Sequence, residues 1–153
     1  MPTQICTIVF ALLVIILDYD DTLLCTSYLA YDLEYIAQLE QSVVDFLHIC
    51  IRLGEVYLIS NAGLNWIRHS SSVVFPKAHD ILIKQCHIIS ACFGRNDANT
   101  KLRCFLKLVS KHPVSMATHI YCIGDSLAEM EAAHKLSRYN CNKLLFMLRS
   151  KQL

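Results

Sequence analysis

The stretch IILDYDDTL, residues 15–23, joins an apolar run to a group of acids. The apolar run covers Ile8–Leu17, and runs rich in Val and Ile are typical of central parallel strands covered on both faces. Asp18, Asp20 and Asp21 follow at once. Like charges this close are unfavourable unless a cation or a bound substrate needs them. Because ligands of open α/β sheets bind outside the carboxyl ends of strands, the stretch predicts a site there; a solvated acidic turn is the alternative.

Length and composition favour one apolar domain. The chain has 153 residues, which suits a single domain over residues 1–153 with a sizeable core. Its 54% hydrophobic content is high for a soluble protein, but a parallel sheet covered on both faces can bury such a surface. The net charge of +1 gives no reason to expect nucleic acid or acidic lipid as a partner. Nothing in the sequence defines an oligomeric state.

Eight cysteines are spread along the chain, and no two have C-x-x-C spacing. This argues against a zinc finger or a thioredoxin-like site and favours free, buried thiols in a reducing compartment. The apolar run at 8–17 has no Lys or Arg before it, unlike a secretory signal. With about ten residues it is also too short for a bilayer, which needs ~20. We therefore expect a cytoplasmic protein without a membrane segment.

Strand and helix patterns alternate along the chain. Strands are expected at Ile8–Leu17, Glu55–Ile59, His87–Ala91, Thr118–Ile123 and Lys143–Leu148, and helices at Tyr31–Leu53, Leu64–Ser70, Ala78–Gln85, Thr100–Lys111 and Leu127–Leu136. Gly54 is placed to end a helix, Thr100 and Ser126 to cap helices, and residues 70–76 to form a loop. The alternation predicts an α/β fold, a three-layer α/β/α sandwich around a mainly parallel, five-stranded, Rossmann-like sheet.

Polar residues follow three of the expected strands. Asp18 and Asp20 follow the first, Ser60 the second and Asp125 the fourth, and Lys101 begins a helix. The carboxyl ends of parallel strands meet at one edge, so these side chains can converge there. Carboxylates, a hydroxyl and an ammonium suit Mg²⁺ and a phosphoryl group.

Three other α/β sites are disfavoured by their motifs. A dinucleotide site needs G-x-G-x-x-G after the first strand, where this chain has acids. A nucleotide hydrolase needs G-x-x-x-x-G-K-[ST], which the chain lacks. A phosphoacceptor receiver domain needs an Asp at the end of a middle strand, but here that strand ends in Ser60 and Asn61.

The motifs present resemble those of the haloacid dehalogenase-like (HAD-like) phosphohydrolases. DYDDTL at 18–23 is similar to their D-x-D-x-T motif after a hydrophobic strand. LISN at 58–61 resembles their second motif, a strand that ends in Ser or Thr. IGDSLAE at 123–129 resembles the fourth, G-D-x-x-x-D, with Glu in the last place. The motifs occur in the family's order and span nearly the whole chain.

The third motif of that family supplies a lysine upstream of the fourth strand. Lys101 is the residue we expect in this role, and Lys84 and Lys107 are nearby alternatives. By the resemblance, Lys101 would bind the phosphoryl group, neutralise its charge and keep Asp18 ionised.

The resemblance implies a Mg²⁺-dependent phosphatase that forms an aspartyl-phosphate. Asp18 would be the catalytic nucleophile, and Asp20 would protonate the leaving oxygen and then activate water. Asp18, Asp125 and the backbone carbonyl of Asp20 would bind the metal. Glu129 would hold a metal-bound water or orient Asp125.

Other positions near the motifs receive smaller roles from the resemblance. Ser60 and Asn61 would bind phosphoryl oxygens, although a lone Ser in this position is more often a strand-end cap. Asn61 and Trp66 are expected at the rim of the site. Asp21 stands where Gly is common in the family, and we expect it to be a bystander in the turn.

Loop lengths predict the absence of a cap domain. Family members insert caps after the first motif or between the second and third, and neither Thr22–Val56 nor Asn61–Lys101 leaves room for one. An open site excludes water poorly around a small substrate, so we expect a large phosphorylated substrate such as a phosphoprotein. A catalytically silent HAD-like binding protein is the alternative function.

Overall fold

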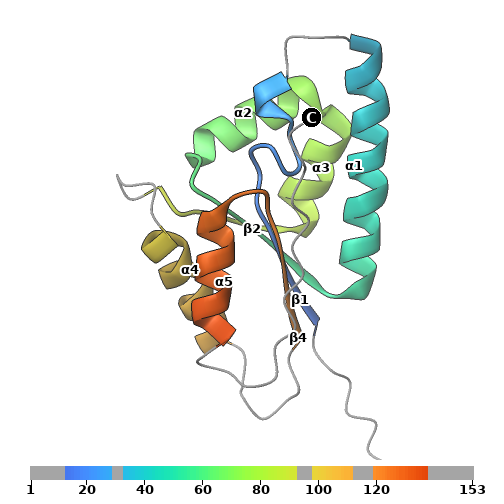
Figure 1. The fold of residues 1–153 in the computed structure, drawn as a ribbon. Coiled ribbons are helices and arrows are strands. Elements are labelled where there is room, and N and C mark those ends of the chain that lie inside the picture. The colour runs from blue at the N-terminus through green and yellow to red at the C-terminus, as the bar shows by residue number, and fades with distance from the viewer. Residues whose placement is uncertain (1–12, 29–32, 93–97, 112–118, 138–153) are drawn as a thin grey trace, which may run out of the picture.

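A computed structural model describes residues 13–28, 33–92, 98–111 and 119–137. Its centre is a parallel sheet with the order β3-β2-β1-β4 (Figure 1). The strands are β1 (Leu13–Leu17), β2 (Glu55–Ser60), β3 (His87–Ser90) and β4 (His119–Ile123). The predicted parallel α/β architecture is thus confirmed with four strands in the described part of the chain. The expected fifth strand at 143–148 and the beginning of the first at 8–12 lie outside it.

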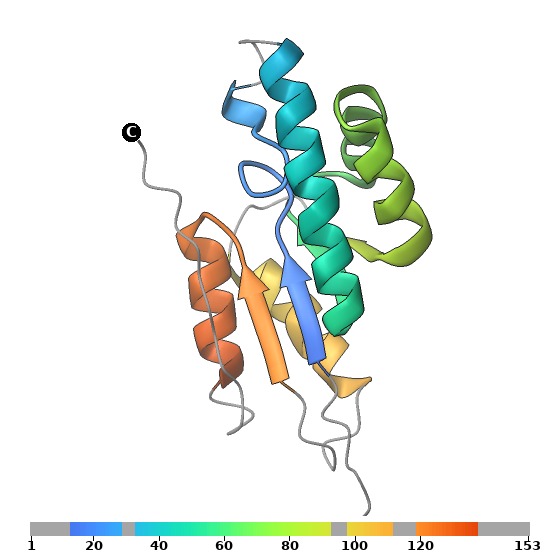
Figure 2. The same cartoon turned by 90° about the vertical axis from the view of Figure 1, so that its right-hand side faces the viewer.

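The strand order β3-β2-β1-β4 reverses its direction at β1, which makes the edge between β1 and β4 a topological switch point. The chain runs from β1 outward to β2 and β3, then crosses back to form β4 on the other side of β1. Figure 2 shows the arrowheads of β1 and β4 pointing the same way. The backbone N–H of Asp18 donates to the Ile123 carbonyl at 2.9 Å, so the two strand ends stay joined. Ligand sites of open α/β sheets lie at such switch points.

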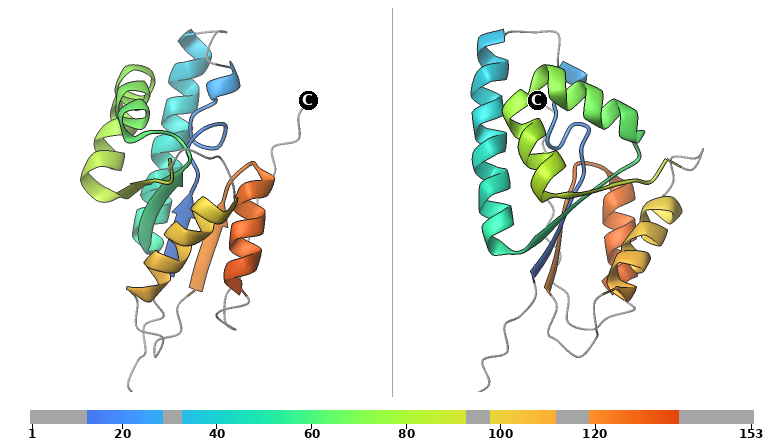
Figure 3. Two further views of the ribbon diagram at one scale, coloured as in Figure 1. Left: turned by 90° about the vertical axis from the view of Figure 1, so that its left-hand side faces the viewer. Right: turned by 180° about the vertical axis from the view of Figure 1, so that it is seen from behind.

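Helices cover both faces of the sheet. On one face lie α1 (Leu33–Leu53), α2 (Leu64–Val74) and α3 (Pro76–Gln85). On the other, α4 (Ala98–Ser110) and α5 (Leu127–Ser137) lie side by side (Figure 3). A short 3-10 helix, η1 (Thr26–Tyr28), follows the acidic turn. The expected three-layer arrangement is therefore observed.

Successive side chains of β1 point to opposite faces of the sheet and so contribute to the core on both sides. Ile15 and Leu17 pack with α1, α2 and α3, whereas Val14 and Ile16 pack with α4 and α5. All four side chains are buried. Because each buried aliphatic side chain of this size stabilises the fold by about 1.5–3 kcal/mol, the apolar stretch before the acids holds both layers together.

Gly54 ends α1, as expected from the sequence, and also lets β1 approach. Its N–H donates to the Cys50 carbonyl at 3.0 Å. A Cβ at this position would lie 2.0 Å from the Leu13 carbonyl oxygen, a distance that no side chain tolerates. Glycine is therefore required for the close passage of the helix end beside β1.

The prediction of a loop at residues 70–76 is wrong, because α2 continues to Val74. Ser70 donates its hydroxyl to the Trp66 carbonyl at 2.7 Å, and the serines at 71–72 bond to preceding carbonyls in the same way. Serine hydroxyls bonded to the preceding turn are compatible with a helix, although serine alone favours caps and loops.

Two helix starts also differ from the sequence prediction. α3 begins at Pro76 rather than Ala78, and proline suits the first position of a helix because its missing N–H has no partner there anyway. α4 begins at Ala98, so Thr100 lies inside its first turn and is not the predicted cap. Thr100 is buried, and hydrophobic spacing did not reveal this earlier start.

The predicted burial of the thiols is observed only in part, because Cys50, Cys104 and Cys122 are buried whereas Cys92 is exposed. Among the described residues, cysteines 25, 50, 86, 92, 104 and 122 form no disulfide bond. Burial raises the pKa of Cys50 and of Cys86 to about 11, so these two thiols stay protonated at neutral pH. Within the described residues, no helix has the length and apolarity needed to cross a membrane.

Candidate active site

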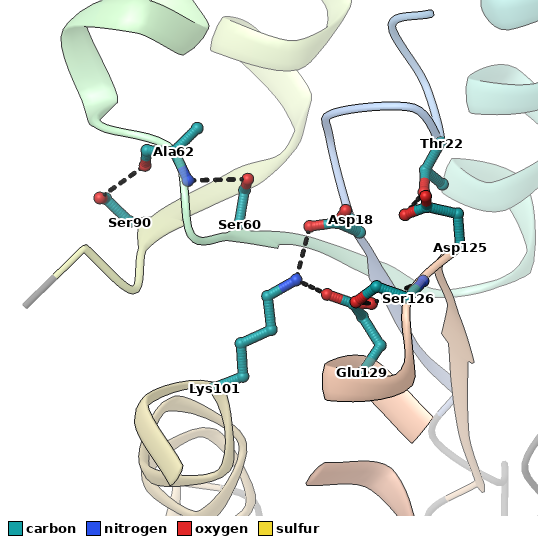
Figure 4. Close-up of polar contacts among 9 residues, drawn as sticks. All are labelled: Asp18, Thr22, Ser60, Ala62, Ser90, Lys101, Asp125, Ser126 and Glu129. Carbon is teal, nitrogen blue, oxygen red and sulfur yellow. Dashed lines mark hydrogen bonds and ion pairs between the residues drawn. The ribbon is translucent and has the colours of Figure 1, made fainter. Parts of the chain in front are cut away.

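Side chains that the sequence analysis assigned to a site gather at the carboxyl ends of β1, β2 and β4, here called the carboxyl edge (Figure 4). Asp18 directly follows β1, Ser60 is the last residue of β2, and Asp125 lies just beyond β4. Lys101 reaches the edge from the first half of α4. The parallel strands therefore bring together groups that are far apart in the sequence.

Lys101 is the centre of a buried ion cluster. Only 1% of its surface is exposed. Its Nζ lies 2.7 Å from Asp18 Oδ1 and also pairs with Glu129 Oε1. We call these three residues the lysine cluster. Of the two alternatives, Lys84 pairs with Asp80 at the surface, and Lys107 lines a separate cavity. Lys101 therefore occupies the expected place beside Asp18.

Both oxygens of Glu129 are engaged. Oε1 pairs with Lys101, while Oε2 accepts from the backbone N–H of Ser126 at 2.9 Å and from its hydroxyl. The backbone contact is half of a capping box, in which an acid three residues into the helix reaches back to the cap. Glu129 therefore organises the start of α5 and supplies a counter-charge to Lys101.

Burial changes the chemistry of Asp18. Loss of hydration raises the pKa of its carboxyl above the ordinary value, and the charge of Asp125 acts in the same direction. The ammonium of Lys101 favours the ionised carboxylate but does not cancel the effect of burial. A further positive charge would therefore be favourable here.

Asp20 lies on the more exposed side of the same turn. Its Oδ1 accepts a hydrogen bond from the indole Nε1 of Trp66 at 3.1 Å. Trp66 comes from the first turns of α2 and is 46% exposed. The sequence placed Trp66 at the rim of the site but contained no indication of this contact.

Asp21 has a structural role in the turn that the sequence analysis did not predict. Its backbone has a φ of 54°, a left-handed conformation that Asp tolerates better than most residues. Its carboxylate accepts from Thr26 Oγ1 at 3.1 Å, and from the backbone N–H and hydroxyl of Ser27 at 2.8 and 2.6 Å. Burial tends to raise the pKa of Asp21, but these hydrogen bonds outweigh it and lower the pKa. Asp21 thus ties the turn to η1.

The end of β2 presents a hydroxyl and a carboxamide. Ser60 Oγ accepts from the Ala62 N–H at 3.1 Å, so its own O–H remains available to donate. Asn61 Oδ1 is buried without a hydrogen-bond partner among the described residues. Rotating the carboxamide by 180° would put its NH₂ there instead, a donor suited to a phosphoryl oxygen.

Four residues around the site were not assigned a site role from the sequence. Thr22 Oγ1 lies 3.5 Å from Asp125 Oδ1, and Ser90 fixes the loop after β2 by donating to the Ala62 carbonyl at 2.8 Å. The S-x-x-E pattern at 126–129 is a signal for the Ser126 contact with Glu129. Tyr19 offered no such signal, because its partner Ser70 lies 51 residues away in the sequence.

The residues present fit a hard divalent cation. Asp18, Asp125 and Glu129 each offer an oxygen, and these atoms all lie within 4.8 Å of one another. Mg²⁺ takes oxygen ligands, usually one or two carboxylates with water and phosphate oxygens. Because Lys101 and Ser126 engage Glu129, the Asp18 and Asp125 carboxylates are the better direct ligands.

Comparison with known proteins identifies the fold. No protein-family model matches the sequence, and no curated protein matches it. The structure is similar to the HAD domain of the effector protein Lem4 from Legionella pneumophila, with a TM-score of 0.57 and 10% sequence identity. The similarity covers 94% of this chain and 89% of that domain. The chain therefore has a HAD-like fold, as its motifs predicted.

Proposed function

We propose that this chain is a Mg²⁺-dependent phosphomonoester phosphatase that works through an aspartyl-phosphate on Asp18. The observation that carries the proposal is the pairing of Asp18 with Lys101 in the buried lysine cluster, beside Asp125 at the switch point of the sheet. A buried carboxylate held by an ammonium is an oriented nucleophile. The HAD-like fold supports the same assignment.

The first chemical step transfers the phosphoryl group to Asp18. Lys101 occupies Oδ1, so we assign the attack to Oδ2. The Oδ2–P bond forms while the bond from phosphorus to the ester oxygen breaks, and Asp20 gives its proton to the leaving oxygen. In the second step Asp20 takes a proton from water, which attacks phosphorus. The Asp18–P bond then breaks and phosphate is released.

The other residues of the site would stabilise charge on the phosphoryl oxygens. In the described part of the chain, Ser60 Oγ only accepts a hydrogen bond, so its O–H can donate, and the buried Oδ1 of Asn61 has no hydrogen-bond partner. Lys101 contributes a preorganised positive charge in a poorly hydrated place, where electrostatic stabilisation is strong.

Magnesium would be held by the Asp18 and Asp125 carboxylates and the Asp20 backbone carbonyl. When bound, Mg²⁺ supplies positive charge that neutralises the phosphoryl oxygens. In this arrangement Glu129 keeps Lys101 and Ser126 in place and is not itself a direct ligand.

We further propose that the protein has no cap and acts on large substrates such as phosphoproteins. Between the first and second motifs the described residues form η1 and α1. Between the second motif and Lys101 they form α2, α3, β3 and the start of α4. The remaining segments, 29–32 and 93–97, are too short for an added domain. A large substrate would itself help to exclude water.

The enzymatic proposal is tested with p-nitrophenyl phosphate. We expect hydrolysis that requires Mg²⁺, is lost in EDTA and is abolished by Asp18→Asn. The matched control is Asp45→Asn on the exposed surface of α1, which should hydrolyse the ester at the wild-type rate. Beryllofluoride with Mg²⁺ should add to Asp18 in a crystal. Absence of both turnover and Mg²⁺ binding would instead favour a silent HAD-like binding protein.

The substrate class is tested separately. We expect kcat/KM to be higher on a panel of phosphopeptides than on a panel of sugar phosphates. A clear preference for the sugar phosphates would contradict the large-substrate proposal and leave the chemistry at Asp18 unaffected.

A further inference from the structure

We propose that Trp66 is a positioning residue for the Asp20 carboxyl, an inference that rests on the acid–base role proposed above for Asp20. Trp66 Nε1 donates to Asp20 Oδ1 at 3.1 Å. Within the described residues this is the one hydrogen bond found on the Asp20 side chain. The indole therefore restricts a carboxyl that lies on a partly exposed turn and would otherwise rotate.

The helix that carries Trp66 is attached to the same turn. Tyr19, between the two catalytic acids, places its phenol oxygen 2.8 Å from Ser70 Oγ and 3.4 Å from the Ile67 carbonyl. Ser70 in turn donates to the Trp66 carbonyl at 2.7 Å. Tyr19, Ile67 and Ser70 are all buried. These contacts hold the start of α2, and with it the indole of Trp66, beside the residue that precedes Asp20.

The hydrogen bond also selects which oxygen carries the acidic proton. An indole N–H only donates, and in a protonated carboxyl the carbonyl oxygen is a stronger acceptor than the hydroxyl oxygen. The hydrogen bond to Oδ1 therefore favours a protonated Asp20 that carries its proton on Oδ2. Oδ2 is then the oxygen that meets the leaving group. Trp66 consequently acts on the proton transfer through Asp20 and touches none of the reacting atoms.

The rival explanation is that Trp66 only packs on the surface. The substitution Trp66→Phe separates the two explanations, because it keeps an aromatic ring and removes the N–H. Tyr35→Phe is the matched control, since Tyr35 is an exposed aromatic residue on α1.

The kinetic test compares two esters. β-Glycerophosphate has a poor leaving group that needs the proton, whereas p-nitrophenolate leaves without one. We expect Trp66→Phe to lower kcat about 5- to 10-fold for β-glycerophosphate, as for the loss of one hydrogen bond to a catalytic carboxyl. For p-nitrophenyl phosphate we expect kcat to fall by less than about 2-fold. KM should change little for either ester, and Tyr35→Phe should match the wild type.

A spectroscopic test does not depend on turnover. Trp66 is the single tryptophan of the chain, so the tryptophan emission reports on the surroundings of this one indole. In EDTA, Asp20→Ala should change the emission maximum or intensity, whereas Asp45→Ala should leave both unchanged.

The outcomes distinguish the two proposals. If the wild type hydrolyses both esters and Trp66→Phe keeps the wild-type kcat for both, or lowers kcat equally for both, the positioning role is overturned. The proposed phosphatase activity is then still supported. Unchanged emission in Asp20→Ala also overturns it. If the wild type hydrolyses neither ester, the proposed function fails and the catalytic role of Trp66 fails with it.

Discussion

The first two acids of the DYDD turn lie in opposite surroundings. Asp18 is 6% exposed and is held by a buried ammonium, whereas Asp20 is partly exposed and accepts a neutral indole N–H. Charges interact more strongly where water is excluded, and an unpaired charge there is also more unfavourable. We therefore expect changes on the Asp18 side to affect stability strongly. Changes on the Asp20 side should act mainly on rate.

The largest effect should follow from removing the buried cation. Lys101→Met leaves Asp18 and Glu129 buried without a counter-charge, and breaking a buried pair in this way typically costs about 3–5 kcal/mol. Urea unfolding at pH 7 measures the loss. Lys84→Met is the control, because the Lys84–Asp80 pair is exposed and should change stability by less than about 1 kcal/mol. Equal effects of the two substitutions would contradict the importance of the lysine cluster.

A smaller effect on the same side is expected from crowding Glu129. A Cβ at Gly124 would lie 2.6 Å from Glu129 Cγ, so Gly124→Ala must displace the acid from Lys101 and should destabilise the protein by about 1–3 kcal/mol. Gly63→Ala is the matched control. Its Cβ meets nothing within 4 Å and its φ is −67°, so we expect a change within about 0.5 kcal/mol. Thermal unfolding of both variants decides the point.

The raised pKa of Asp18 predicts a pH dependence of stability. A carboxyl whose pKa is higher in the folded state binds its proton more tightly there, so its contribution falls as pH rises from the unfolded value of 3.8 through the folded pKa. Asp18→Asn removes this dependence. In EDTA, the free energy of unfolding of Asp18→Asn minus that of wild type should therefore increase with pH across this window. A constant or decreasing difference would show that the pKa of Asp18 is not raised.

The smallest effect is expected at Asp21 on the exposed side. Asp21→Gly loses the hydrogen bonds from Thr26 and Ser27 but relieves the left-handed backbone at φ 54°. The two changes oppose each other, so stability should change by no more than about 1 kcal/mol. Asp21→Ala loses the same bonds and keeps the backbone strain, so it should be the less stable of the two. A more stable Asp21→Ala would contradict this account of the turn.

Local sequence signals identified most of the fold. Apolar runs and helical spacing located β1 to β4 and α1 to α5, because burial patterns are properties of adjacent residues. The extension of α2 was missed because it depends on serine hydroxyls that bond within the helix. The start of α4 was placed too late because capping preference favoured Thr100.

The candidate site was predicted less completely. The convergence of the strand-end acids with Ser60 was predicted from the rule that the carboxyl ends of parallel strands lie at one edge of the sheet. That prediction did not require knowledge of side-chain packing. The contacts of Glu129 with Lys101 and of Trp66 with Asp20 depend on how separate elements pack. No local pattern encodes such contacts.

The sequence by itself determined the succession of strands and helices along the chain and the positions of the acids at strand ends. Only the tertiary structure decided which lysine meets Asp18, because Lys101 lies 83 residues away from it in the sequence. Their contact depends on the placement of β4 beside β1 and on the packing of α4 against the sheet. Likewise, the two acids of one turn received opposite surroundings from different layers: α4 and α5 buried Asp18, and α2 bound Asp20 at the surface.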